Sequence, residues 1–167
     1  MSLRIILIVL LSLLSACSEV SYDTIRIKEG IHYKGSSEKP FSGTAVEKYE
    51  SGNIKSKRVF QNGKLHGAYK SYFENGQIMY EGHYKEGESH GAHLGYYKTG
   101  RLKYKLNYVH DLEHGLSEVY YSNGQLETLT EYDLGVRHGY SKRYNMSGEL
   151  VTTKHFQDGK LIKTEEH

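Results

Sequence analysis

The 167-residue chain contains no tryptophan, one proline and one cysteine. Because Cys17 is the only cysteine, an exported form of the chain has no internal disulfide and must be stabilised by packing. The scarcity of proline accompanies 16 tyrosines and 18 glycines, a composition that favours strands and tight turns over helices. The 22 basic and 20 acidic residues are interleaved and nearly cancel, so the charge predicts no nucleic-acid partner.

The sequence also lacks the local signatures of catalysis. It has no G-x-S-x-G, no H-E-x-x-H and no phosphate-binding loop. Four histidines do recur at the same place in the repeats described below, and they are His66, His90, His114 and His138. In a meander, equivalent residues two strands apart lie about 9.6 Å from each other, which is too far for two ligands of one zinc ion. We therefore expect a structural role for these histidines, and we predict no enzyme, no cofactor and no metal site.

The N-terminus has the features of a secretory signal. A weakly basic start, Met1 to Arg4, precedes an apolar run from Ile5 to Leu14, which is too short to span a bilayer. The following Leu14-Ser15-Ala16-Cys17 resembles a bacterial lipobox, in which the cysteine is acylated and becomes the first residue of the mature protein. The sequence thus predicts a signal peptide over residues 1–16 and lipidation at Cys17.

The lipobox resemblance also implies a localisation in the cell. Ser18 stands where an aspartate would mark retention in the inner membrane of enteric-type bacteria. In a Gram-negative host the resemblance therefore implies the periplasmic face of the outer membrane. Firm anchoring needs more than one acyl chain, and triacylated lipoproteins meet that condition.

Residues 17–41 form the least regular part of the chain. Apolar and polar residues alternate from Tyr22 to Lys28 and again around Ile31 and Tyr33, which predicts one or two strands. The only proline, Pro40, lies in the turn-rich "SSEKPFSG". We interpret 17–41 as an acylated tether followed by an N-terminal cap, because repeat arrays generally need atypical ends.

From residue 42 to 161 the chain repeats with a period of 24 residues, followed by a tail, 162–167. The five modules have a first glycine, a second glycine nine residues later, an aliphatic residue two positions further, and an aromatic residue seventeen positions after the first glycine. The first glycines are Gly43, Gly67, Gly91, Gly115 and Gly139, and the second are Gly52, Gly76, Gly100, Gly124 and Gly148. A fixed period with punctuating glycines predicts a modular array.

Each module has the pattern of a β-hairpin. Dipeptides such as Asn75-Gly76 and Asn123-Gly124 predict a two-residue loop in which both residues have positive φ. This loop would place each first glycine opposite the aromatic residue that covers it, and would place Phe73 opposite Ile78. A second turn, such as Glu86-Gly87, joins one hairpin to the next. We therefore predict an all-β fold, an elongated single-sheet antiparallel meander of five 24-residue hairpin repeats with an N-terminal cap.

The "Y..NG.L......Y..G...G" pattern resembles the MORN-type repeats of bacterial proteins often labelled YwqK-like antitoxins, and "EKPFSG" is similar to the segment that opens their first repeat. The resemblance extends from about Tyr33 to Leu161. It implies an elongated β-sheet and protein interaction, with membrane contact in some relatives. Since a lipoprotein signal would carry the chain away from cytosolic toxins, immunity to an envelope-acting or incoming toxin would fit better.

One face of the predicted sheet carries a candidate binding surface. Its rings form a ladder about 29 Å long, from three steps of about 9.6 Å, and they are Tyr72, Tyr96, Tyr120 and Tyr144. Tyrosine offers contact area at low entropic cost, so the ladder suits a protein or a glycan, although the rings can equally serve only to pack on the sheet. Two hypotheses follow: a lipid-anchored envelope module that binds a protein, a toxin among the candidates, or a binder of envelope polysaccharide or peptidoglycan.

Overall fold

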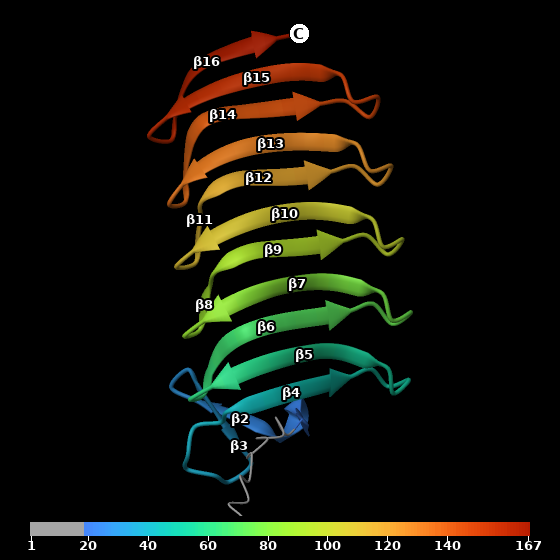
Figure 1. The fold of residues 1–167 in the computed structure, drawn as a ribbon, viewed down its shortest axis with the longest axis vertical. Coiled ribbons are helices and arrows are strands. Elements are labelled where there is room, and N and C mark those ends of the chain that lie inside the picture. The colour runs from blue at the N-terminus through green and yellow to red at the C-terminus, as the bar shows by residue number, and fades with distance from the viewer. Residues whose placement is uncertain (1–18) are drawn as a thin grey trace, which may run out of the picture.

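The computed structural model describes residues 19–167, and in this range the chain is almost entirely β-structure (Figure 1). The N-terminal elements are β1 (Glu19–Ser21), the 3-10 turn η1 (Tyr22–Thr24), β2 (Ile25–Lys28) and β3 (Ile31–Lys34). The repeats comprise β4 (Gly43–Lys48), β5 (Ile54–Gln61), β6 (Lys64–Tyr72), β7 (Ile78–Lys85), β8 (Glu88–Ser89), β9 (Gly91–Tyr96), β10 (Leu102–Val109), β11 (Leu112–Glu113), β12 (Gly115–Tyr120), β13 (Leu126–Asp133), β14 (Val136–Tyr144), β15 (Leu150–Gln157) and β16 (Lys160–Glu166).

The repeats form one open sheet in which successive strands are neighbours. Its order is β1-β4-β5-β6-β7-β9-β10-β12-β13-β14-β15-β16, with the short β8 and β11 paired to β7 and β10. Every pair is antiparallel except β1, which runs parallel to β4. Figure 1 shows the strands stacked like rungs along the long axis, with β16 at the far end from the N-terminal elements. The predicted all-β meander of hairpin repeats is confirmed.

The turns between modules are the tight two-residue turns of the sheet. Both central residues of each turn have positive φ, as at Glu86 (54°) and Gly87 (94°). The same is true of His110 and Asp111, although this turn has no glycine at its second position. Two adjacent residues of positive φ define the type I′ turn, whose twist matches that of the flanking strands. Each turn also bonds to the preceding module, since the Gly87 N–H donates to the Leu65 carbonyl at 2.8 Å.

The loops inside the modules differ from the prediction. Gly76 has φ +84°, but Asn75 does not have positive φ, so the Asn-Gly pair is not a type I′ loop. Instead the Gly76 N–H donates to the Phe73 carbonyl at 2.8 Å and the Phe73 N–H donates to the Gln77 carbonyl at 2.8 Å. This geometry is the three-residue loop in which a turn is followed by a left-handed glycine.

The longer loop changes the register at one end of each hairpin. The first glycine does pair with the expected aromatic residue, as Gly67 pairs with Tyr84. A bulge then shifts the ladder, so that Ile78 pairs with Tyr72 and not with Phe73, which lies in the loop. Because a shift of one residue moves a side chain to the other face of a sheet, the predicted pairing of loop aromatic and aliphatic residues was wrong.

The aromatic partner does not cover the first glycine in the predicted manner. Gly91 pairs with Tyr108, yet a Cβ at Gly91 would meet no atom within 4 Å. The backbone itself explains the glycine, since Gly91 has φ +74°, a conformation that side chains of L-residues rarely adopt.

The N-terminal elements cover one face of the first module. β2 and β3 form a separate two-stranded sheet, and Phe41 packs with Ala45 and Phe60 in a small core. Ala45 is 0% exposed and Phe60 is 3% exposed. Of the one or two strands predicted around Tyr22 to Tyr33, the structure has two, β2 and β3, and together with Phe41 they cap one end of the array.

The other end of the array is different. Residues 162–167, predicted as a tail, belong largely to β16, which pairs with β15 over Lys160–Glu166. The continued alternation of the chain after Gly159 adds half a module to the sheet, so the tail assignment is corrected.

Candidate interaction surface

The register assigns the aromatic residues to two faces of the sheet. We call the "ladder face" the one that carries the four predicted ladder tyrosines, and the "ring face" the one that carries Phe60, Tyr84, Tyr108, Tyr132 and Phe156. Residues that pair directly across antiparallel strands point to the same side. The aliphatic residues therefore lie beside the tyrosines on the ladder face, in the pairs Tyr72–Ile78, Tyr96–Leu102, Tyr120–Leu126 and Tyr144–Leu150.

Carboxylates hold two of the ladder tyrosines in place. The Tyr96 hydroxyl donates to Glu81 Oε1 at 2.7 Å, and the Tyr120 hydroxyl donates to the Glu118 carboxylate. Burial, followed by the hydrogen bond to the carboxylate, raises the pKa of each of these tyrosines to about 12. The hydrogen bond from Tyr96, aided by one from Lys70, lowers the pKa of Glu81, and Lys70 Nζ lies 3.0 Å from Glu81 Oε2. The two central rings of the ladder, Tyr96 and Tyr120, are thus partly buried, neutral and held by carboxylates.

Ladder tyrosines also receive hydrogen bonds through their backbone. The hydroxyls of the loop residues Tyr49, Tyr97 and Tyr121 donate to the carbonyls of Tyr72, Tyr120 and Tyr144 at 2.6–2.9 Å. Each of these bonds reaches from the loop of one module to the end of the next module's first strand. The loop tyrosines, which the sequence assigned to cross-strand pairs, therefore hold neighbouring hairpins together.

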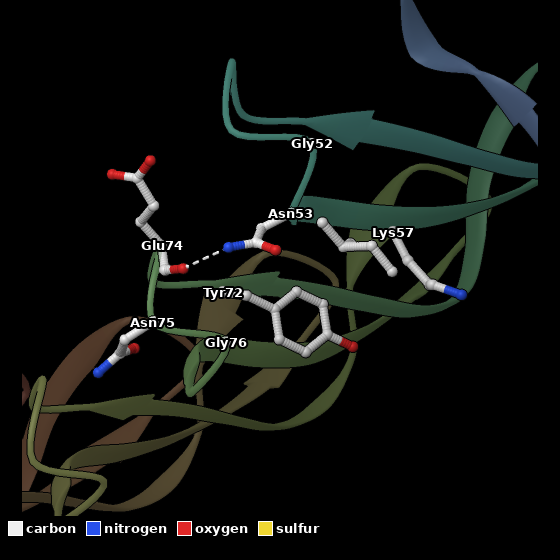
Figure 2. Close-up of a pocket in the computed structure, with 8 residues that line it drawn as sticks. Gly52, Asn53, Lys57, Tyr72, Glu74, Asn75 and Gly76 are labelled. Carbon is white, nitrogen blue, oxygen red and sulfur yellow. Dashed lines mark hydrogen bonds between the residues drawn. The ribbon is translucent and has the colours of Figure 1, made fainter.

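Tyr72 lines a cavity of about 650 Å³ at the loop edge of the first two modules. Figure 2 shows its ring below Asn53 and beside Lys57, with Asn75 and Gly76 from the next loop. The Asn53 side-chain amide donates to the Glu74 carbonyl at 3.0 Å and bridges the two loops. The ring shares the cavity with Ile54, Asn53 and Lys57, whereas the side chains of Glu74 and Asn75 point away from it (Figure 2).

The ring face carries a cluster that the sequence did not reveal. His93, which is 3% exposed, donates from Nε2 to the His83 carbonyl at 2.9 Å, and its Nδ1 accepts from the Tyr80 hydroxyl at 2.7 Å. The Tyr84 hydroxyl lies 3.1 Å from that of Tyr80 and completes the chain of bonds. Burial lowers the pKa of His93 and raises that of Tyr80, so both groups stay neutral.

Two glycines outside the repeating pattern make room for this cluster. A Cβ at Gly95 would collide with the Tyr104 ring, and one at Gly82 would lie 3.0 Å from the His93 ring. Glycine here permits close approach of rings to the backbone. These two extra glycines were the signal in the sequence that could have located the cluster.

The ring face changes character toward the C-terminal end. The positions of Tyr80 and Tyr104 are taken by Thr128 and Thr152 in the last two modules, and a groove of about 420 Å³ replaces the packed rings. Hydroxyl groups line this groove, and Lys154 and Arg137 lie along it. Only the first module has its ring face covered by the cap.

The four recurring histidines lie at the turns between modules. His66 Nδ1 accepts a hydrogen bond from the Glu86 N–H at 3.4 Å, and His114 Nδ1 lies 3.3 Å from Asp133 Oδ1. His90 faces His110, with ring centroids 6.3 Å apart. Within residues 19–167, no group of three or more His, Cys, Asp or Glu residues could hold a metal ion.

The predicted lipidation site, Cys17, and the signal peptide lie outside the described residues. In residues 19–167, no helix has the length and hydropathy needed to cross a membrane.

Comparison with known families supports the modular interpretation. The model of the MORN repeat variant matches residues 42–62, 65–86, 89–110 and 113–133, which together make up more than half of the chain. No curated protein matches the sequence. The fifth hairpin lies beyond the matched segments, but its Gly139–Phe156 pair repeats the register of the other four. The chain therefore belongs to the MORN repeat variant family and is built of hairpin repeats in a single sheet.

Proposed function

We propose that this protein is a lipid-anchored module of the cell envelope that binds a partner protein through its ladder face. The observation that carries this proposal is the set of side chains that surround the ladder tyrosines. Tyr96 lies beside Leu102 and Tyr120 beside Leu126, with the ion pair of Lys70 and Glu81 at their flank. Aromatic and aliphatic contact area bordered by charged groups is the composition of a protein interface.

The order of the ladder also favours binding. Association costs free energy when mobile side chains become fixed. The rings of Tyr96 and Tyr120 are already held by Glu81 and Glu118, so little of this cost remains. Tyrosines that are rigid before contact are the kind of residue that anchors a binding surface.

The position of Cys17 supports the anchor. β1 begins at Glu19, two residues after the cysteine, and it is part of the main sheet. Two residues span at most about 7 Å, so acylation of Cys17 would hold the capped end of the array close to the membrane surface. An envelope-acting or incoming toxin is the partner class that combines this address with the antitoxin-like resemblance.

Affinity capture from solubilised envelopes tests the proposal. The variant Tyr96→Ala with Tyr120→Ala should lose a stoichiometric partner that the wild-type protein retains. The matched control removes two rings from the opposite face, Tyr108→Ala with Tyr132→Ala, and should retain that partner. Thermal melts on the same preparations identify any loss that is due to unfolding. Equal retention by wild type and ladder variant would refute the ladder as the binding surface.

The cavity beside Tyr72 favours a second candidate function, the binding of envelope glycan. The Tyr72 ring can stack on a sugar, and Asn53 and Lys57, which line the same cavity, can bond to its hydroxyls (Figure 2). Sedimentation with isolated cell-wall sacculi measures this activity. Tyr72→Ala should abolish co-sedimentation if the glycan is the ligand, whereas the capture experiment above would then return no protein.

A further inference from the structure

The last strand of the sheet is half of a hairpin. Lys160, at the start of β16, lies 24 residues after Val136, at the start of β14. β14 pairs on both sides, with β13 and with β15, whereas among residues 19–167 the only strand that pairs with β16 is β15. β16 is the outermost strand at this end of the array (Figure 1), so a row of backbone N–H and C=O groups along Lys160–Glu166 faces outward.

The two ends of the sheet differ in whether their outer strand edge is covered. At the N-terminal end, β1 pairs with the outer edge of β4 and the cap packs on the first module. At the other end Leu161 is 53% exposed and Ile162 is 63% exposed. Proteins usually block an open strand edge because it can template pairing with another chain. Because the cap and β1 cover the other end, β16 is the long strand edge of this sheet to which a further strand can pair.

The charges along β16 are complementary to those of a second, antiparallel copy of the same strand. Lys160 and Lys163 lie in its first half, and Glu165 and Glu166 lie at its end. A second copy of the strand that approaches in the antiparallel direction brings each basic half against the other's acidic half. Lys163 Nζ already lies 2.6 Å from Glu165 Oε1 within one chain, so both residues present charge on the same face.

We propose that β16 pairs with β16 of a second copy of this chain about a two-fold axis at Thr164. This register places Lys163 opposite Glu165 of the other copy, twice, and Thr164 opposite itself. The neighbouring symmetric register would place Lys163 against Lys163, and like charges directly opposite each other are unfavourable. The pairing joins two sheets into one, with the two Cys17 anchors at opposite ends. It does not depend on the function proposed for the ladder face.

A cysteine at the axis tests this pairing. Opposed residues of an antiparallel pair have Cα atoms about 4.5–5.5 Å apart, within the range of a disulfide. Thr164 is exposed, so Thr164→Cys should leave the fold intact. In the full chain under mild oxidation, this variant should form a covalent species of twice the 19.1 kDa of the monomer. Wild type controls for Cys17, and Lys160→Cys, which has no opposite residue in this register, should remain monomeric.

Charge exchange tests the register. In the Thr164→Cys background, Glu165→Lys should remove most of the cross-linked species, because two Lys–Lys pairs replace two Lys–Glu pairs. The double exchange Lys163→Glu with Glu165→Lys should restore it. Thermal melts of all variants should agree with that of the Thr164→Cys chain. The proposal is overturned if Thr164→Cys stays monomeric, if Lys160→Cys cross-links equally, or if Glu165→Lys has no effect.

Discussion

Gly91 and Gly95 lie four residues apart on β9, and the structure requires glycine at each for a different reason. Gly91 has φ +74°, and a Cβ there would meet open space. Gly95 does not have positive φ, but a Cβ there would collide with the ring of Tyr104. One site is limited by backbone conformation and the other by volume.

Two substitutions at each site separate these causes. At Gly91, alanine should cost about 1–2 kcal/mol for a left-handed conformation, and asparagine should cost less because its short polar side chain tolerates that conformation. At Gly95, alanine should cost about 1–3 kcal/mol by overpacking against Tyr104, and the larger asparagine should cost more. The order of alanine and asparagine therefore reverses between two glycines of one strand.

Thermal unfolding followed by circular dichroism measures the effect. For a chain of this size, 1 kcal/mol corresponds to about 2–4 °C in Tm. Gly91→Ala should lower Tm by about 2–8 °C, with Gly91→Asn closer to wild type, while Gly95→Asn should melt below Gly95→Ala. If alanine is the better substitute at Gly91, the left-handed conformation assigned to Gly91 is wrong, and if asparagine is the better substitute at Gly95, the position assigned to the Tyr104 ring is wrong.

Three further predictions concern the anchor and two titratable groups. Cys17→Ser should abolish metabolic labelling with palmitate, and labelling that persists would refute the lipobox interpretation. Burial lowers the pKa of His93 below the ordinary histidine value of about 6.5, so the unfolded state binds more protons below that pH. The free energy of unfolding should therefore fall as the pH drops through about 6.5, and His93→Phe should weaken this fall in urea denaturation. The pKa of Glu81 is lowered by the Tyr96 hydrogen bond, so its stabilising contribution is present above about 4.5 and is lost on further acidification; Glu81→Gln should flatten that limb of the stability curve, and an unchanged limb would contradict the assignment.

The sequence predicted the architecture well because backbone requirements repeat with the period. Dipeptides that end in glycine, such as Glu86-Gly87, mark turns in which both residues have positive φ. The cross-strand pairing of Gly67 with Tyr84 follows from their spacing in the sequence. These features depend on local conformation. A short stretch of sequence is therefore enough to predict them, and the 24-residue period repeats that stretch five times.

The faces of the sheet were harder to predict. Asn75-Gly76 is the dipeptide of a two-residue loop, but the chain forms a three-residue loop with a bulge, and this moved Ile78 from Phe73 to Tyr72. The same three-residue loop forms at Phe73 and at Asn145, where no tyrosine hydroxyl bridges the modules, so the loop type does not require that bridge. Where the bridge is present, as from the Tyr49 hydroxyl to the Tyr72 carbonyl at 2.7 Å, it joins residues 23 positions apart and was not predicted from the sequence.

The same distinction separates the parts of the chain that maintain the array from those that can specialise it. Turn glycines recur because most other residues are strained at positive φ, whereas nothing in the backbone requires a tyrosine at position 80 or 104. At the equivalent places Thr128 lines one groove in the ring face and Thr152 lines a smaller one, while the register of the hairpins stays the same. Substitutions on either face therefore alter a surface without altering the sheet that presents it. Stability of the sheet should accordingly depend on the turn glycines, and recognition on the side chains of its two faces, including the recurring ladder tyrosines.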